Sequence, residues 1–149
     1  MIEFAPVREL VPHAPPMLWL RRVVAHDGRS TECEACTDDL GLLLDAAGFA
    51  PGYAMIELAA QCVAAHARLV AADDSPPRIG FLLGTRRFDL HAAQLAPGQI
   101  LRARVTRLWG AATGPVSFAA EVRDAATAEV LAAGRISCFT PSPSASPSR

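Results

Sequence analysis

The residues best suited to chemistry lie in the stretch PGYAMIELAAQ, which runs from Pro51 to Gln61. A Pro-Gly turn leads here into an apolar segment that carries one carboxylate, Glu57, and the amide of Gln61 four residues later. Acidic side chains are almost never fully buried without a partner. A carboxyl that carries a proton inside an apolar channel would account for this one, because burial raises its pKa toward neutrality. Such a group is suited to general acid catalysis.

The spacing of the same residues also fits a plainer interpretation. At about 100° per residue, Glu57, Gln61, Ala64 and Arg68 fall on one stripe of a helix. A polar stripe on an amphipathic helix is ordinarily its solvent-facing side. Spacing alone therefore favours an exposed stripe over a buried proton-transfer group.

The start of this segment offers donors for a developing negative charge. Backbone N–H groups near Gly52 and Tyr53 would lack partners within a helix and would lie at its positive end. Gly52 also has no side chain to block an approaching substrate. We therefore expect Gly52 and Tyr53 to contact substrate, and Gln61 to hold Glu57 in orientation from one turn away.

Among the four histidines, His13 is the best candidate for a second proton-transfer group. It is fixed between Pro12 and the Pro15-Pro16 pair, in a stiff segment that leads into the first predicted strand. A histidine flanked by prolines can also serve only as a hydrogen-bond partner of the backbone, and the sequence leaves both roles open.

The other three histidines fit this role less well. His66 follows Glu57 by nine residues, which places it on nearly the opposite helix face and about 13 Å along the axis. We expect it to be a core or interface histidine. His26 adjoins a turn and is expected to be exposed, and His91 remains a minor candidate at the end of a strand.

Cysteine spacing gives little support to a metal or redox centre. Cys33 and Cys36 form a lone CxxC, whereas a structural zinc site ordinarily needs four ligands. The surrounding STECEACT alternates like a strand, in which positions three apart point to opposite faces. We expect reduced thiols and no metal.

Composition restricts the class of protein. The chain has 149 residues, of which 51% are apolar and 19% charged, with a formal net charge of −1. A near-neutral chain with few aromatics lacks the basic patch and stacking surface of a nucleic-acid binder. Its longest apolar stretch, 53–72, carries too many polar groups for a membrane span. The first ten residues do not resemble a secretory signal, so we expect a cytoplasmic protein.

The pattern along the chain predicts two strands, one long helix and then four strands. A proline-punctuated entry at 6–16 precedes them, and a loop or a short helix plus loop is expected at 38–52. The strands are expected at 17–27, 30–37, 78–90, 99–109, 115–124 and 128–139, with the helix at 52–72. This order predicts a single α+β domain, 1–140, with an antiparallel sheet wrapped around a central helix. A disordered Pro/Ser-rich tail, 141–149, would follow it. The exposed sheet edges favour a dimer.

Three segments together resemble a known family: VPHAPPMLWLRRV, PGYAMIELAAQ and IGFLLGTRRFDLHAAQLAPGQILRARV. The chain resembles the hotdog-fold 3-hydroxyacyl-acyl-carrier-protein dehydratases of fatty-acid synthesis, and more narrowly their aryl-polyene-associated branch. The resemblance runs from about Pro6 to Phe139. It implies dehydration of 3-hydroxyacyl thioesters to enoyl thioesters in fatty-acid or polyene biosynthesis, with Glu57 as the acid. The substrate would be carried on the phosphopantetheine of an acyl carrier protein, with no other cofactor.

One departure from the family pattern leaves the activity open. The family's catalytic histidine precedes the helix, and an ungapped alignment puts Leu43 at that position. His13 is then the candidate to replace it. Two alternatives remain: a thioesterase of the same fold, in which a helix carboxylate activates water, and a non-catalytic subunit that stabilises an active hotdog partner. The dimer is accordingly expected to be a homodimer or a heterodimer with another hotdog protein.

Overall fold

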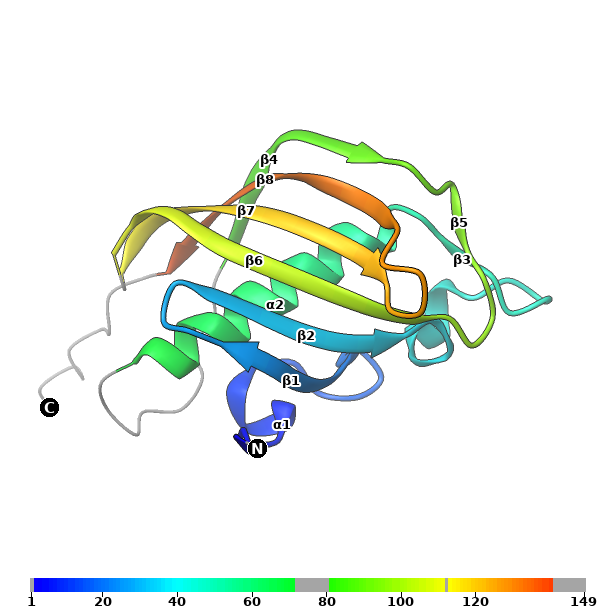
Figure 1. Cartoon of the computed structure of the whole chain (residues 1–149), viewed down its shortest axis with the longest axis horizontal. Helices are drawn as coiled ribbons and strands as arrows, with labels where there is room; N and C mark the ends of the chain where they lie inside the picture. The colour runs from blue at the N-terminus through cyan, green and yellow to red at the C-terminus, as the bar shows by residue number, and fades with distance from the viewer. Residues whose placement is uncertain (1, 72–80, 112, 141–149) are drawn as a thin grey trace, which may run out of the picture.

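Six antiparallel strands form one sheet in the computed structural model, which describes residues 2–71, 81–111 and 113–140 (Figure 1). The strands are β1 (Leu20–His26), β2 (Ser30–Cys36), β4 (Phe81–Leu90), β6 (Ile100–Gly110), β7 (Gly114–Asp124) and β8 (Val130–Thr140). Their order across the sheet is β1-β2-β6-β7-β8-β4. A separate two-stranded ladder joins β3 (Ala50–Pro51) to β5 (Gln94–Leu95).

Alternation along the strands sets which face of the sheet is buried. In β6, Leu101, Ala103 and Val105 are fully buried, whereas Arg102 and Arg104 between them are not. Successive side chains of a strand point to opposite faces, so each strand presents one apolar row to the core. The outer face carries the charged residues.

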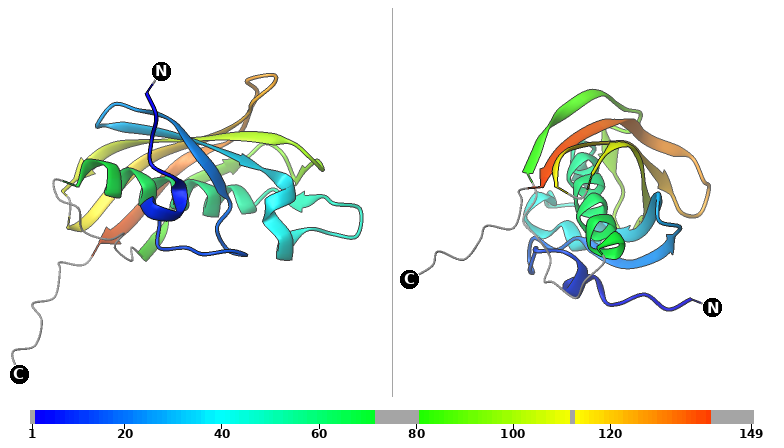
Figure 2. Two further views of the ribbon diagram at one scale, coloured as in Figure 1. Left: turned by 90° about the horizontal axis from the view of Figure 1, so that it is seen from below. Right: turned by 90° about the vertical axis from the view of Figure 1, so that its left-hand side faces the viewer.

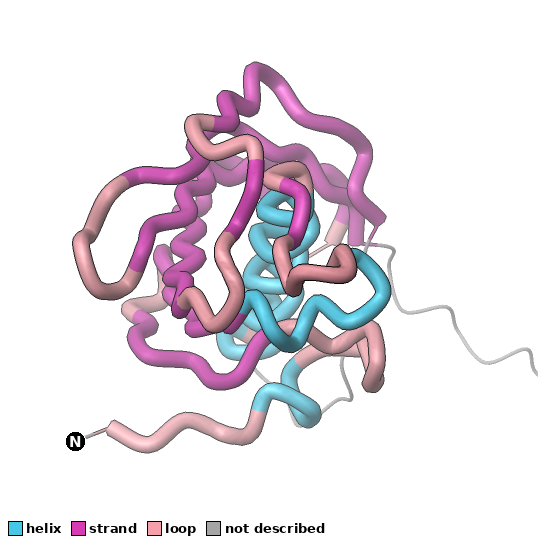
Figure 3. Tube along the Cα trace, turned by 90° about the vertical axis from the view of Figure 1, so that its right-hand side faces the viewer, coloured by secondary structure: helices cyan, strands magenta, loops and turns pink. Residues whose placement is uncertain are grey.

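The long helix α2 (Ala54–Val70) lies inside the curve of the sheet, as the views along it show (Figures 2 and 3). Its sequence is rich in Ala and Leu and has no internal Gly or Pro, which favours a helix. Met55, Leu58 and Cys62 are fully buried and belong to the same core as the inner row of β6. No helix in the described ranges is long and apolar enough to cross a membrane.

The side of α2 that the sheet leaves open is covered by the N-terminal segment (Figure 2). This segment contains the single-turn helix α1 (Val7–Leu10). Val7, Leu10 and Val11 are buried and belong to the main core cluster. The proline-rich entry is therefore part of the folded domain, and it forms a cover over the helix.

The predicted fold class is confirmed: an α+β hotdog arrangement with an antiparallel sheet around one long helix. The segment expected as a loop or short helix contains a 3₁₀ helix, η1 (Thr37–Leu43). The β3–β5 ladder was not predicted, because strands of two residues leave no periodic pattern. Residues 72 and 78–80 and the predicted tail, 141–149, lie outside the described residues.

The four cysteines are buried and free. Cys62 Sγ on α2 lies 3.5 Å from Cys33 Sγ on β2, and burial raises the pKa of the Cys62 thiol well above its ordinary value. The Cys62 thiol is therefore protonated at neutral pH. Within the described ranges, no group of three or more His, Cys, Asp or Glu is arranged to hold a metal ion.

His66 is a core histidine at the far end of α2 from Glu57, with only 1% of its surface exposed. Its Nδ1 lies 2.8 Å from the hydroxyl of Thr31, which is also 2.8 Å from Nδ1 of His26. The expectation that His26 is exposed is wrong, because this shared hydroxyl and the ring of His66 hold it half-buried. Nε2 of His66 is buried and has no hydrogen-bond partner among the residues that the structure describes. Burial, reinforced by repulsion from His26 and Arg107, lowers the pKa of His66 to about 4.

This lowered pKa predicts a pH-dependent stability. Unfolded histidine has a pKa of about 6.5, so between pH 6.5 and 4 the unfolded state binds more protons than the folded state. The free energy of unfolding should therefore be fully retained above pH 6.5 and fall by about 3 kcal/mol as the pH drops to 4. Urea denaturation at several pH values measures it, with His66→Gln as the comparison. If the free energy of unfolding of the two proteins changed with pH in the same way, His66 would not be the source of the pH dependence.

Candidate active site

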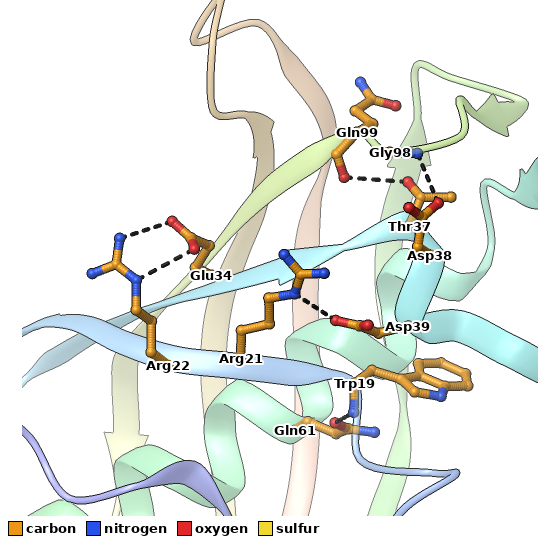
Figure 4. A network of polar contacts seen from close by, with 10 residues as sticks. All are labelled: Trp19, Arg21, Arg22, Glu34, Thr37, Asp38, Asp39, Gln61, Gly98 and Gln99. Atoms are coloured by element: carbon orange, nitrogen blue, oxygen red, sulfur yellow. Dashed lines mark hydrogen bonds and ion pairs between the residues drawn. The ribbon is translucent and has the colours of Figure 1, made fainter.

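The buried amide of Gln61 ties the N-terminal segment to the helix. Its oxygen accepts a hydrogen bond from the backbone N–H of Trp19 at 3.0 Å. Its nitrogen donates to the carbonyl of Met17 at 2.8 Å and to Oε1 of Glu57 at 3.2 Å. Figure 4 shows Gln61 reaching from α2 to Trp19. Gln61 is fully buried. The interpretation of the polar helix stripe that begins at Glu57 as a solvent-facing side is therefore wrong at Gln61.

The N-terminal segment that covers α2, called the covering segment below, also places His13 next to Glu57. Nε2 of His13 lies 3.4 Å from Oε1 of Glu57, and the two side chains are 28% and 36% exposed. The indole N–H of Trp19 donates to the carbonyl of Pro16 at 3.2 Å, which fixes the turn between His13 and β1. The two residues predicted as a proton-transfer pair are thus in contact within one chain.

The pKa of Glu57 differs from the expectation. Burial is the largest single influence and raises it, but the contacts with His13 and Gln61, together with the charge of His13, outweigh burial. The pKa of Glu57 is therefore lowered below its ordinary value, and the predicted rise is wrong. At neutral pH the carboxyl is ionised and partnered, which explains how an acidic side chain is tolerated in this apolar segment.

Gly52 has a packing role that its sequence position did not reveal. Its N–H donates to the carbonyl of Ala93 at 2.8 Å, so the expectation of an unsatisfied donor at Gly52 is wrong. A Cβ at this position would lie 2.0 Å from the carbonyl oxygen of Ala92. The N–H of Tyr53, in contrast, has no acceptor within the described part of the chain, and the Tyr53 side chain is 59% exposed.

The segment before α2 supplies no replacement for the family's loop histidine. Leu43, at the aligned position, packs half-buried against the core. The two acids of η1 have other partners: Asp38 accepts from the N–H of Gly98 at 2.8 Å, and Asp39 pairs with Arg21 at 2.6 Å (Figure 4). His91 is exposed after the end of β4. Sequence reasoning missed the partners of Gln61, Met17 and Trp19, because main-chain contacts between distant segments leave no residue pattern.

The close approach at Gly52 predicts a destabilised variant. Gly52→Ala should lower the free energy of unfolding by roughly 1–3 kcal/mol, because the new methyl group collides with rigid backbone. Gly84→Ala is the matched control, since a Cβ there meets nothing within 4 Å. Chemical denaturation of both variants tests this, and equal stability of the two would refute the packing role.

The contacts of Glu57 predict how its titration responds to substitution. His13→Ala and Gln61→Met each remove a contact that lowers the pKa of Glu57, so each variant should raise that pKa toward or above its ordinary value. Carboxyl ¹³C NMR titration measures the shift. Asp124, whose pKa is lowered chiefly by a hydrogen bond from Gln99 and not by His13 or Gln61, is the internal control, and its titration should not change. An unchanged Glu57 titration in both variants would show that the contacts have no electrostatic effect.

The solved structures similar to this chain share its fold. The dehydratase heterocomplex ApeI:P from Xenorhabdus doucetiae is 24% identical, with a TM-score of 0.85, over 94% of this chain and 93% of that chain. A hypothetical thioesterase with coenzyme A from Streptococcus pneumoniae is 9% identical, with a TM-score of 0.60, over 80% and 84%. The PaaI protein of E. coli, from the phenylacetic acid degradation operon, is 11% identical, with a TM-score of 0.60, over 80% and 78%. Identities this low show the fold alone.

The search of curated proteins gave no match. A family model, in contrast, matches nearly the whole chain. The model of the ApeP-like family, described as ApeP dehydratase, matches residues 5–148. This range includes the covering segment, the helix with Glu57 and all six strands of the sheet. The chain therefore belongs to the ApeP-like dehydratase family.

Proposed function

We propose that this protein converts 3-hydroxyacyl thioesters, carried on the phosphopantetheine of an acyl carrier protein, into 2-enoyl thioesters and water. The observation that carries the proposal is the contact between His13 and Glu57 at the amino-terminal half of α2. It supplies two proton-transfer groups in a chain that lacks the loop histidine of the fatty-acid-synthesis dehydratases it resembles. We further propose a role in aryl-polyene or fatty-acid biosynthesis, in the cytoplasm.

The pair has the chemistry that the elimination requires. One proton leaves C2, whose acidity comes from the thioester carbonyl, and the C2–H electron pair forms the C2–C3 double bond. The C3–O bond breaks, and the departing hydroxyl takes a proton to become water. Glu57, whose carboxyl is ionised at neutral pH, would accept the first proton. The carboxyl protonated in this way, or His13 in contact with it, would then deliver a proton to the departing hydroxyl. The reaction is redox-neutral and needs no cofactor beyond phosphopantetheine.

The helix terminus provides for the charge on the thioester oxygen. The N–H of Tyr53, which has no acceptor among the described residues, lies at the positive end of the 17-residue α2 and would donate to this oxygen. Because the N–H of Gly52 is engaged, we assign Gly52 to the close packing of this turn. Gln61 is likewise assigned to positioning, since its amide groups are used by Trp19, Met17 and Glu57.

We also propose that the protein works with a second, different hotdog chain. The sequence left homodimer and heterodimer open, and the similar Xenorhabdus structure is described as a dehydratase heterocomplex, which supports the second. In a heterodimer this chain would contribute its own His13–Glu57 pair or would only stabilise its partner. Substitution of Glu57 within the assembled complex separates these two roles.

The assay measures enoyl and free-thiol products from a 3-hydroxyacyl carrier protein, using the chain alone and with its hotdog partner. Glu57→Gln and His13→Ala should each lower the enoyl rate about 100-fold or more, because each removes a proton-transfer group. Glu9→Gln, an exposed acid on α1, is the matched control and should retain the rate. A folded Glu57→Gln complex with the full rate would assign the chemistry to the partner, and thiol release without enoyl would indicate a thioesterase.

A further inference from the structure

The two edges of the six-stranded sheet differ in what covers them. β1, at one edge, contacts α1 of the N-terminal segment. β4, at the other edge, pairs with no strand other than β8 in the described part of the chain, and Figure 1 shows it at the margin of the molecule. An edge of ten residues that no other described strand covers presents a row of N–H and C=O groups that can accept another strand.

Two adjacent exposed leucines near the start of β4 form an apolar surface that a partner protein could cover. Leu82 is 43% exposed and Leu83 is 61% exposed. The pairing of β4 with β8 is irregular between Leu82 and Gly84, where Leu83 is an extra residue without a counterpart on β8. A partner that adds a strand and its own packed layer at this edge would cover the two leucines together.

The centre of β4 carries a concentrated positive charge. Arg86 on β4 lies directly opposite Arg135 on β8, and like charges in that position repel. Arg87 follows at an irregularity of the strand, and its only acidic neighbour in the described structure is Asp89, at 3.4 Å. Three arginines and one aspartate give this edge a net charge of +2. These arginines line an open groove of about 400 Å³, together with Leu108, Ala119 and Gly134.

We propose that the β4 edge selects a partner strand with acidic side chains and rejects a second copy of this chain. Arg135 on β8 and Arg86 on β4 lie opposite each other. A partner strand that pairs with β4 would place one residue directly opposite Arg86, at a distance of about 5 Å. An acidic residue there would offset the repulsion between the two arginines. A second copy would bring its own net charge of +2 against this one in any antiparallel register, even one that pairs Arg86 with Asp89. This inference rests on the heterodimer in the proposed function, and it names the chemistry of that partner.

The experiment uses the chain itself as the probe. In Arg86→Glu/Arg87→Glu the edge changes from +2 to −2, so the variant presents an acidic version of the same strand. Sedimentation velocity at low salt should show the wild type alone near 15.8 kDa and an equimolar mixture with the variant near twice that mass. The mixed dimer should dissociate as salt rises, because the screening length falls from about 10 Å at 0.1 M to about 3 Å at 1 M.

The controls separate edge charge from net charge and from folding. Arg8→Glu/Arg29→Glu makes the same change in net charge at two exposed residues away from β4, and its mixture with wild type should stay monomeric. If the β4 variant does not fold, the wild type alone tests the inference. Its self-association should then increase with salt, because salt screens the repulsion between two positively charged β4 edges. A wild-type dimer at low salt, or mixed dimers formed equally by the control variant, would overturn it. None of these readouts depends on dehydratase activity, so failure here leaves the catalytic proposal intact.

Discussion

The site depends on one buried side chain, the amide of Gln61. Its oxygen and its nitrogen bind the main chain at Trp19 and Met17, and the nitrogen also contacts Glu57. These bonds join the N-terminal segment to the helix, and that segment carries His13. An amide buried without these partners would be unfavourable by a few kcal/mol, so the segment and the helix are stabilised together. The proton-transfer pair is thus a consequence of how the helix is covered.

The two ends of α2 show how burial and partners determine charge. Glu57 is partly buried, but His13 and Gln61 stabilise its ionised form, so its pKa falls. His66 is almost completely buried, and Nε2 of its ring has no hydrogen-bond partner in the described part of the chain. Burial, with the influence of His26 and Arg107, lowers its pKa, so the ring is neutral. The same helix therefore carries a charged acid where the covering segment provides partners and an uncharged histidine where the core does not.

The covering segment also makes the sheet asymmetric. It protects the β1 edge, whereas the β4 edge retains exposed leucines and arginines. In a fold with one helix and one curved sheet, the surface that the described residues leave uncovered is available to a partner. The charge on that surface then influences which partner is accepted, since strand pairing by itself discriminates little between chains.

The sequence by itself determined the fold class, the long helix and the six main strands, because periodicity and Pro or Gly turns are local properties of the chain. It also identified Glu57 and His13 as candidates from residue type and from family resemblance. Only the tertiary structure decided that they meet, that Gln61 is buried and that the N–H of Gly52 is engaged by Ala93. Each of these facts joins segments far apart in the chain, and the sign of the Glu57 pKa shift is set by the balance of such contacts with burial. That balance is a property of three-dimensional distances, which local sequence patterns do not encode.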